Sequence, residues 1–260
     1  CRDGFGGLQD GALERHPFVE FQRTVAGDDE LAAFVLREIW ERHRFRDPRV
    51  ALTTEIGTQF GPASSELGAP PRGARVSSLR RASEPEFFAR FAFPLHISDV
   101  RVARVRQQKE PEDSASALRR TLGLRLGPKE ETKPDTPASL SELTPYEQEL
   151  SLGQQLTRVC RDQIQYLAVA ATNPVDVVFL AQEARKYCPG ITLVTLGSDV
   201  LFSHPDLRSA FTGTLVASSY PLLYASRVWT SPEQPQPFPN QVAEGFYNAF
   251  VGLAERRGVV

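Results

Sequence analysis

The sequence predicts an α/β protein built on a parallel sheet, and three features of one stretch support this fold class. Residues 166–171 and 191–196 are short apolar runs, typical of strands that are buried on both faces. Between them, apolar side chains recur at helical spacing, and a Pro-Gly pair ends the helix. Asn173 suits the cap of this helix, Pro174 its first turn, and Asp176 its positive end. Two strands joined by one helix form a right-handed parallel crossover.

Upstream of this unit, the sequence predicts a series of helices and strands. Residues 28–44 form a helix that begins at two aspartates and carries apolar side chains on one face, namely Leu31, Phe34, Val35 and Ile39. The elements expected after it are a strand at 49–54, a short helix at 63–67, a strand at 75–79 and a helix at 84–91. Ser83 is the expected cap of the last helix, and Pro85 lies in its first turn.

Residues 107–149 differ in composition from the rest of the chain, because they are rich in Pro, Glu, Lys, Ser and Thr. Such a segment buries too little apolar surface to offset the entropy of ordering it, so we predict a disordered insertion. A helix at 150–164 then leads into the central unit. The elements expected after that unit are a short helix at 201–211, a strand at 213–219, a Pro-rich linker at 231–239 and a helix capped by Asn240, with Val242, Phe246, Tyr247, Phe250 and Leu253 on its apolar face.

The charge and the composition argue against several classes of protein. A formal net charge of -2 gives no reason to expect a nucleic-acid partner. No apolar run approaches the ~20 residues that a membrane span needs. The chain begins at Cys1 and contains no methionine, which favours a piece of a longer protein over a processed, lipid-anchored terminus. Cys160 and Cys188 either pair in an oxidising compartment or remain buried thiols, and we favour the thiols.

The sequence contains no recognisable motif for a nucleotide, a zinc ion or a catalytic serine. The histidines have no metal-ligand spacing, so we expect no metal and no cofactor; they are His16, His43, His96 and His204. An enzyme on a doubly wound sheet needs a nucleophile beside a base, and no such pair is evident. We therefore expect a protein that is not an enzyme. The alternative is an α/β hydrolase or transferase without a recognisable motif.

Polar side chains follow the carboxyl ends of the predicted parallel strands, where open α/β sheets bind ligands. The candidate ligand-binding residues are Glu55, Gln59, Phe60, Thr172, Asn173, Ser198, Asp199 and Tyr220. Capping or turn formation explains each of them singly, but as a set they line one rim of the sheet. The hydroxyls of Thr172 and Ser198, near helix starts, suit a carboxylate, whereas Glu55 or Asp199 suits an ammonium group.

Five segments of the chain occur in an order that a known family shares. In sequence they are FVEFQRTVAGDDELAAFVLREI, RVALTTEIGTQFG, VDVVFLAQEARKYCPGITLVTLGS, FTGTLVASSYPL and FPNQVAEGFYNAFVGLAERR. In this order the chain resembles the type I periplasmic binding proteins, particularly the amino-acid-binding proteins of ABC importers and related receptor ligand-binding regions. The resemblance implies two lobes that close on a ligand between them. Residues 1–48 are then a remnant of the first lobe, 49–230 the second lobe, and 231–260 a linker and a helix that returns to the first lobe.

The resemblance also implies a function. It predicts a solute-binding or ligand-sensing module for an amino acid or a similar small polar ligand, located in the periplasm or another extracytoplasmic compartment. Its expected protein partner is a membrane permease or a sensor.

The chain departs from the family in three places. The first strands and helices of the first lobe are absent, which indicates truncation at the N-terminus, and the importers lack the 107–149 insertion. Phe60 replaces the family's tyrosine and so lacks a hydroxyl, while Glu55 stands near its acidic position. With an incomplete first lobe, we expect the helices at 28–44 and 240–253 to expose their apolar faces.

Overall fold

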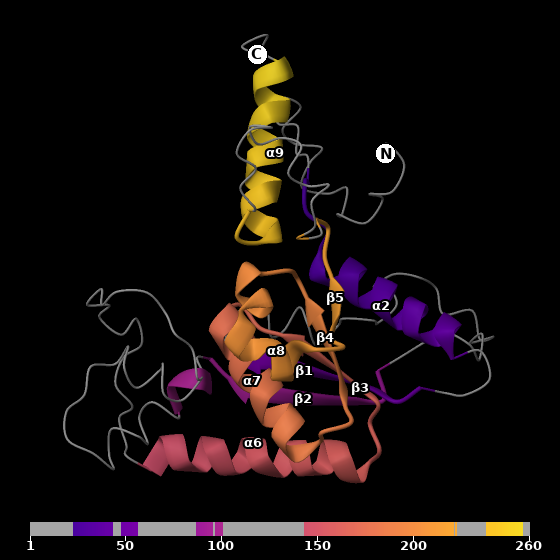
Figure 1. Cartoon of the computed structure of the whole chain (residues 1–260), viewed down its shortest axis with the longest axis vertical. Helices are drawn as coiled ribbons and strands as arrows, with labels where there is room; N and C mark the ends of the chain where they lie inside the picture. The colour runs from indigo at the N-terminus through magenta and orange to yellow at the C-terminus, as the bar shows by residue number, and fades with distance from the viewer. Residues whose placement is uncertain are drawn as a thin grey trace, which may run out of the picture.

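The structure is a computed structural model that describes residues 23–43, 48–56, 87–95, 97–100, 143–220, 222 and 238–256. Within these ranges the chain forms a five-stranded, all-parallel sheet (Figure 1) with the strand order β2-β1-β3-β4-β5. The strands are β1 (Val50–Ile56), β2 (Ala89–Pro94), β3 (Tyr166–Ala170), β4 (Thr192–Leu196) and β5 (Leu215–Ala217). The α/β class is therefore confirmed, as are the strands predicted at 49–54, 166–171, 191–196 and 213–219.

Helices cover both faces of the sheet. The labelled α-helices are α2 (Asp28–Arg42), α6 (Leu143–Arg161), α7 (Pro174–Tyr187), α8 (Arg208–Phe211) and α9 (Gln241–Arg256), and two 3-10 turns precede α8, namely η1 (Val200–Ser203) and η2 (Pro205–Leu207). Residues 97–100, after β2, are also helical. One face packs against α2, and the other against α6, α7 and α8. The predicted strand–helix–strand unit is confirmed, because β3 and β4 are parallel neighbours and α7 connects them.

Side chains of β1 alternate between the two faces of the sheet, as the pleat of a strand requires. Val50 and Leu52 pack with α2, whereas Ala51 packs with α6 and α7. Thr53 and Glu55 share the register of Ala51, so they also face the α6–α7 side. This alternation places a carboxylate in the interior of the molecule, close to the carboxyl end of β1.

The expectation that the helix at 28–44 exposes its apolar face is wrong. Its predicted stripe is buried against the sheet at Leu31, Val35 and Ile39, and only Phe34 departs from the pattern, with 58% of its surface exposed. Ala32 and Leu36 complete the packed face instead. The helix therefore stabilises the sheet, although the division of the chain into lobes remains a prediction.

The helix α9 does expose an apolar face, as predicted. Phe246 and Phe250 are 73% and 72% exposed, and Val242 and Leu253 lie at least half exposed beside them. In Figure 1 this helix projects away from the sheet, at the opposite end of the molecule from α6. Asn240 caps it as expected, because its Oδ1 atom accepts a hydrogen bond of 2.9 Å from the Ala243 backbone N–H.

The predicted helix at 84–91 is wrong over the described residues 87–91, because the end of that segment begins strand β2. Phe91 and Phe93 point into the molecule, whereas Arg90 and Ala92, which alternate with them along the strand, are exposed. This alternation is the period of a strand, and β2 forms a parallel ladder with β1 over its whole length. Pairing with β1 prevails over the local helix-start signals at Ser83 and Pro85, which lie outside the described residues.

The helix α6 begins at Leu143, seven residues before the predicted boundary at 150. The predicted disorder of residues 107–149 is therefore wrong over 143–149. Pro145 lies in the first turn, where its missing N–H leaves no helical hydrogen bond unmade. Extending an established helix is far easier than nucleating one, so polar residues upstream of the buried Leu152 and Leu156 join it. The remainder of the predicted insertion, with the elements predicted at 63–67 and 75–79, lies outside the described residues.

Cys160 and Cys188 form a disulfide, so the interpretation of both as unpaired buried thiols is wrong. The bond joins the last turn of α6 to the residue that follows α7, with the two Cα atoms 5.7 Å apart. Helices that pack side by side on one face of the sheet are thus linked covalently at their ends. Among the helices that the structure describes, none is both long and apolar enough to cross a membrane.

Candidate functional site

The strand order defines a topological switch point between β1 and β3. The chain leaves β1 toward β2 on one side and later places β3 on the other side of β1. In sheets of this order, ligands bind in the crevice where connections from neighbouring strands diverge, at the carboxyl ends of the strands. Glu55 lies near the end of β1, and Thr172 follows the end of β3 by two residues. These two predicted site residues therefore meet at the switch point.

A pair of hydrogen bonds joins Glu55 to Thr172. The Oε2 atom of Glu55 accepts one of 2.6 Å from the Thr172 hydroxyl and one of 3.2 Å from the Thr172 backbone N–H. Glu55 is 0% exposed, and its Oε1 atom has no hydrogen-bond partner in the part of the chain that the structure describes. Since buried polar atoms are nearly always paired, this oxygen marks a position suited to a hydrogen-bond donor.

A residue at the start of α7 connects the segment after β2 to the same carboxyl-end edge of the sheet. Asp176, in its first turn, is fully buried, and its Oδ1 atom accepts hydrogen bonds from the Ser98 N–H at 3.0 Å and the Ser98 hydroxyl at 2.5 Å. Ser98 follows β2 by four residues. Asn173 caps α7 by accepting a hydrogen bond from the Val175 N–H at 2.9 Å, so the prediction that Asn173 caps this helix is confirmed. Glu55 and Asp176 together tie the ends of β1 and β2 to the connection from β3 into α7.

Ser198 and Tyr220 belong to a second polar cluster, where β4 and β5 end. Ser198 is 4% exposed, and its hydroxyl lies 2.8 Å from the Ser218 hydroxyl and donates to the Tyr220 carbonyl at 3.1 Å. The Gln241 Oε1 atom accepts from the Ser219 N–H at 3.1 Å. Asp199 caps the turn η1 by accepting from the Leu201 N–H at 2.8 Å. The hydroxyl and carboxylate expected to bind a ligand here are thus engaged within the protein.

Three segments that are far apart in the sequence meet beside this cluster. The Tyr220 hydroxyl donates to the Thr24 carbonyl, and the Thr24 hydroxyl donates to the Gly245 carbonyl at 2.9 Å. The Ala26 N–H donates to the Ser219 hydroxyl at 2.8 Å. A Cβ atom at Gly245 would overlap the Val25 side chain, so α9 requires glycine where residues 24–26 cross it. We call residues 24–26, 218–220 and 239–245 the three-segment junction.

Glu244 is the titratable group buried in this junction. Burial raises the pKa of the Glu244 carboxyl above its usual range, because its charged form is poorly solvated there. A carboxyl group whose pKa is raised in the folded state makes its full contribution to stability at a pH below its pKa in the unfolded state. That contribution is lost as the pH rises through the folded-state pKa.

We expect Glu244→Gln to raise the melting temperature relative to the wild type by an amount that grows from pH 4 to pH 7, because glutamine cannot ionise. Scanning calorimetry at several pH values measures this difference. Glu255→Gln, an exposed position on the same helix, is the control. A difference that stays constant with pH would contradict the assignment.

Sequence reasoning missed several residues of these clusters. Gln241 and Ser98 carry no local signal, because only the folded chain brings them to Ser219 and Asp176. Gly245 carries no distinctive signal either, because α9 contains a second glycine, Gly252, at which a Cβ atom would meet nothing within 4 Å. Gln59 and Phe60 lie outside the described residues. Within the described ranges, no three His, Cys, Asp or Glu side chains group as metal ligands.

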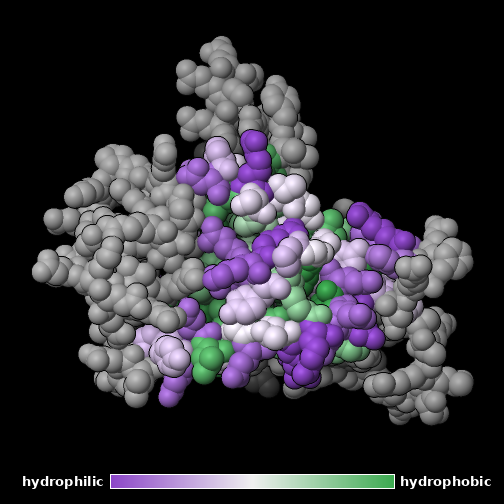
Figure 2. All heavy atoms as spheres, turned by 60° about the horizontal axis from the view of Figure 1, so that its bottom comes forward, coloured by the Kyte–Doolittle hydropathy of each residue, from purple (hydrophilic) through white to green (hydrophobic). Residues whose placement is uncertain are grey.

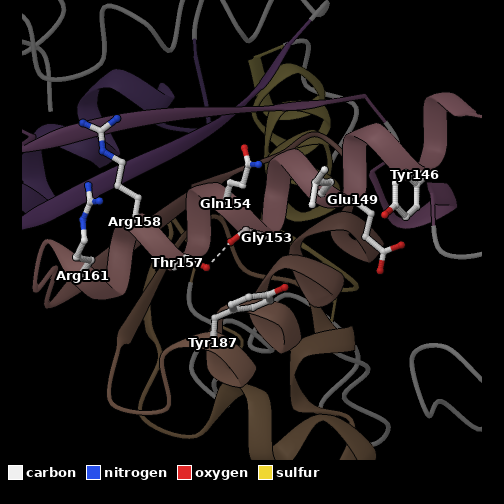
Figure 3. A pocket seen from close by; sticks show the side chains of 9 residues that line it. Tyr146, Glu149, Gly153, Gln154, Thr157, Arg158, Arg161 and Tyr187 are labelled. Carbon is white, nitrogen blue, oxygen red and sulfur yellow. Dashed lines mark hydrogen bonds between the residues drawn. The ribbon is translucent and has the colours of Figure 1, made fainter.

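A groove of about 530 Å³ runs along the outer side of α6, away from the switch point. In Figure 3 Arg158 and Arg161 stand at one end, directed away from Tyr187, while Tyr146 and Glu149 stand at the other. Both arginines also bind Asp162, at 3.3 and 3.4 Å. Figure 2 turns this side of the molecule toward the viewer and shows hydrophilic residues interleaved with small hydrophobic areas. Because its polar groups do not converge, we place the candidate site at the switch point instead.

The comparisons with known proteins identify no relative. No family model matches the chain, and neither the curated proteins nor the solved structures give a match. The fold class therefore stands on the structure alone, and the resemblance to type I periplasmic binding proteins stays a prediction.

Proposed function

We propose that the chain is a non-enzymatic solute-binding or ligand-sensing module that binds a small polar ligand at the β1–β3 switch point. The observation that carries this proposal is the buried carboxylate of Glu55, whose Oε1 atom has no partner among the described residues. It lies at the edge where sheets of this strand order bind ligands. An amino acid or a similar zwitterion is the ligand class that the family resemblance adds.

The arrangement of α9 supports the two-lobed part of this proposal. In the described part of the chain, helices already cover both faces of the sheet, and α9 lies beyond them with Phe246 and Phe250 exposed. It is connected to the sheet through the three-segment junction. A complete first lobe beyond the junction would give this apolar face a place to pack and would put the strand-end rim in an interlobe cleft.

The side chains of the rim favour a binder over a hydrolase or transferase. Thr172 and Ser198 donate their hydroxyl protons to acceptors within the protein, and neither is paired with a histidine in the described residues. A histidine does meet a hydroxyl elsewhere, since His43 Nε2 lies 2.7 Å from the Tyr166 hydroxyl. Tyr166 begins β3, however, so this pair lies at the opposite edge of the sheet.

The disulfide supports an extracytoplasmic location, which we propose together with a membrane permease or a sensor as the protein partner. Structural disulfides such as Cys160–Cys188 persist in oxidising compartments and are rare where thiols are kept reduced.

A thermal-shift panel of the twenty standard amino acids tests the proposed function on the full chain. We expect at least one to raise the melting temperature, by about 5–10 °C at a hundredfold excess over its dissociation constant. Tyr187→Phe, in the groove beside α6, should leave that shift unchanged. Turnover of ester or phosphoester substrates without such a shift would favour the enzyme, and no shift with any amino acid would contradict the amino-acid ligand class.

A further inference from the structure

We propose that Glu55 determines the charge of the ligand group that enters the switch point: the site accepts a cationic nitrogen, such as an ammonium or guanidinium group, and rejects carboxylates and phosphates. This inference rests on the proposed function, because it assumes that a ligand binds at this edge. The sequence predicts a ligand carboxylate beside Thr172, and this inference places a cationic nitrogen of the ligand there instead.

The first argument concerns the acceptor that Glu55 leaves open. Its Oε2 atom already accepts two hydrogen bonds from Thr172, whereas Oε1 accepts none among the described residues. The ionised Glu55 carboxylate can only accept hydrogen bonds, so only a ligand group that donates a hydrogen bond satisfies Oε1. A positively charged donor does so most strongly, because hydrogen bonds between ionised partners are shorter and stronger than neutral ones.

The second argument concerns the donors that an anion would need. The start of a helix presents unpaired N–H groups and a positive dipole end, and this arrangement ordinarily binds anions. Here Thr172, which directly precedes the α7 cap residue Asn173, gives both its N–H and its hydroxyl to Glu55. An anionic ligand would therefore find these donors occupied and would meet a charge of its own sign.

The third argument concerns access, because Glu55 itself is fully buried. Thr172 is exposed, and so is Ile56, the last residue of β1, with 55% of its surface accessible. The carboxylate thus lies one side chain below the surface. Rotation of the Thr172 side chain removes one hydrogen bond to Oε2 and opens a path to the carboxylate. The bond from the Thr172 N–H meanwhile keeps the carboxylate oriented.

The test uses putrescine as a cationic probe, and succinate and inorganic phosphate as anionic probes, titrated into the full chain by calorimetry. We expect the wild type to bind putrescine more tightly than either anion. Glu55→Gln should weaken putrescine binding about ten- to hundredfold, since the acceptor of the cation keeps its oxygen but loses its negative charge. Glu55→Ala should bind phosphate or succinate more tightly than the wild type does, because it frees the two Thr172 donors.

Thr172→Ala provides a second variant that retains the carboxylate, in case substitution of Glu55 prevents folding. It should bind putrescine at least as tightly as the wild type, because it opens the path to Glu55. Wild-type binding that prefers the anions, or equal putrescine affinity in Glu55→Gln, would overturn the inference alone. If none of the amino acids and none of these probes binds, the proposed function fails together with it.

Discussion

Loss of the Cys160–Cys188 disulfide is expected to lower the free energy of unfolding by about 3.5 kcal/mol. The two cysteines are separated by 28 residues, and closing a loop of that length removes conformational entropy from the unfolded chain. That loop contains β3 and all of α7, so the bond constrains the unit around which the sheet is built. Denaturant unfolding with and without a reductant measures the difference.

The control for this experiment removes the third cysteine of the chain, Cys1, by substitution with serine, so that no other thiol can exchange. In that background Cys160→Ala should reproduce the effect of the reductant, and reductant should then have no further effect on the variant. Equal stability of the oxidised and reduced protein would show that the bond does not form in solution.

Replacing Asp176 by alanine is expected to lower the free energy of unfolding by about 3 kcal/mol. Its carboxyl group accepts from both the N–H and the hydroxyl of Ser98, and all these groups are buried. Each buried donor left without an acceptor costs about 1–3 kcal/mol. The loss also frees the helical stretch 97–100 after β2 from the start of α7, so ligand affinity at the switch point should fall with stability. Chemical denaturation and calorimetry measure the two effects.

A double-mutant cycle separates this interaction from other consequences of the substitution. Asp176→Asn retains an acceptor oxygen and should cost less than Asp176→Ala, and Ser98→Ala removes one of the two donors. If the two residues interact as described, Ser98→Ala should cost much less in the Asp176→Ala background than alone. Additive effects would contradict the assignment.

The sequence was sufficient for elements whose signals are local. The helix α7 was predicted with its cap because Asn173, Pro174 and a periodic apolar stripe all indicate the same helix, and burial on the sheet agrees with them. The strand β2 was missed for the opposite reason. Its residues follow a sequence that suits a helix start, and only the neighbouring β1 makes an extended conformation favourable.

The same distinction between local signals and long-range pairing holds for the candidate site. The apolar runs locate the strand ends, so the sequence predicts Glu55 and Thr172 as site residues. Their direct hydrogen bond depends on the strand order, which no local pattern specifies. Likewise, the sequence predicts Ser198 as a ligand hydroxyl, but its place in a buried cluster depends on the distant helix α9. The sequence located the rim, whereas long-range packing decided which of its groups remain available.

The strand order also has a consequence for biosynthesis. Glu55 and Thr172 are 117 residues apart, and Tyr220 is 196 residues from the Thr24 carbonyl to which it donates. At ribosomal rates of about 5–20 residues per second, roughly 6–23 s pass after the synthesis of β1 before the strand that flanks it at the switch point is made. During that interval the apolar stripe of α2 and one edge of β1 lack their native cover. A nascent chain of this topology is expected to engage chaperones before its second hundred residues have emerged, and rapid synthesis should improve its yield of folded protein.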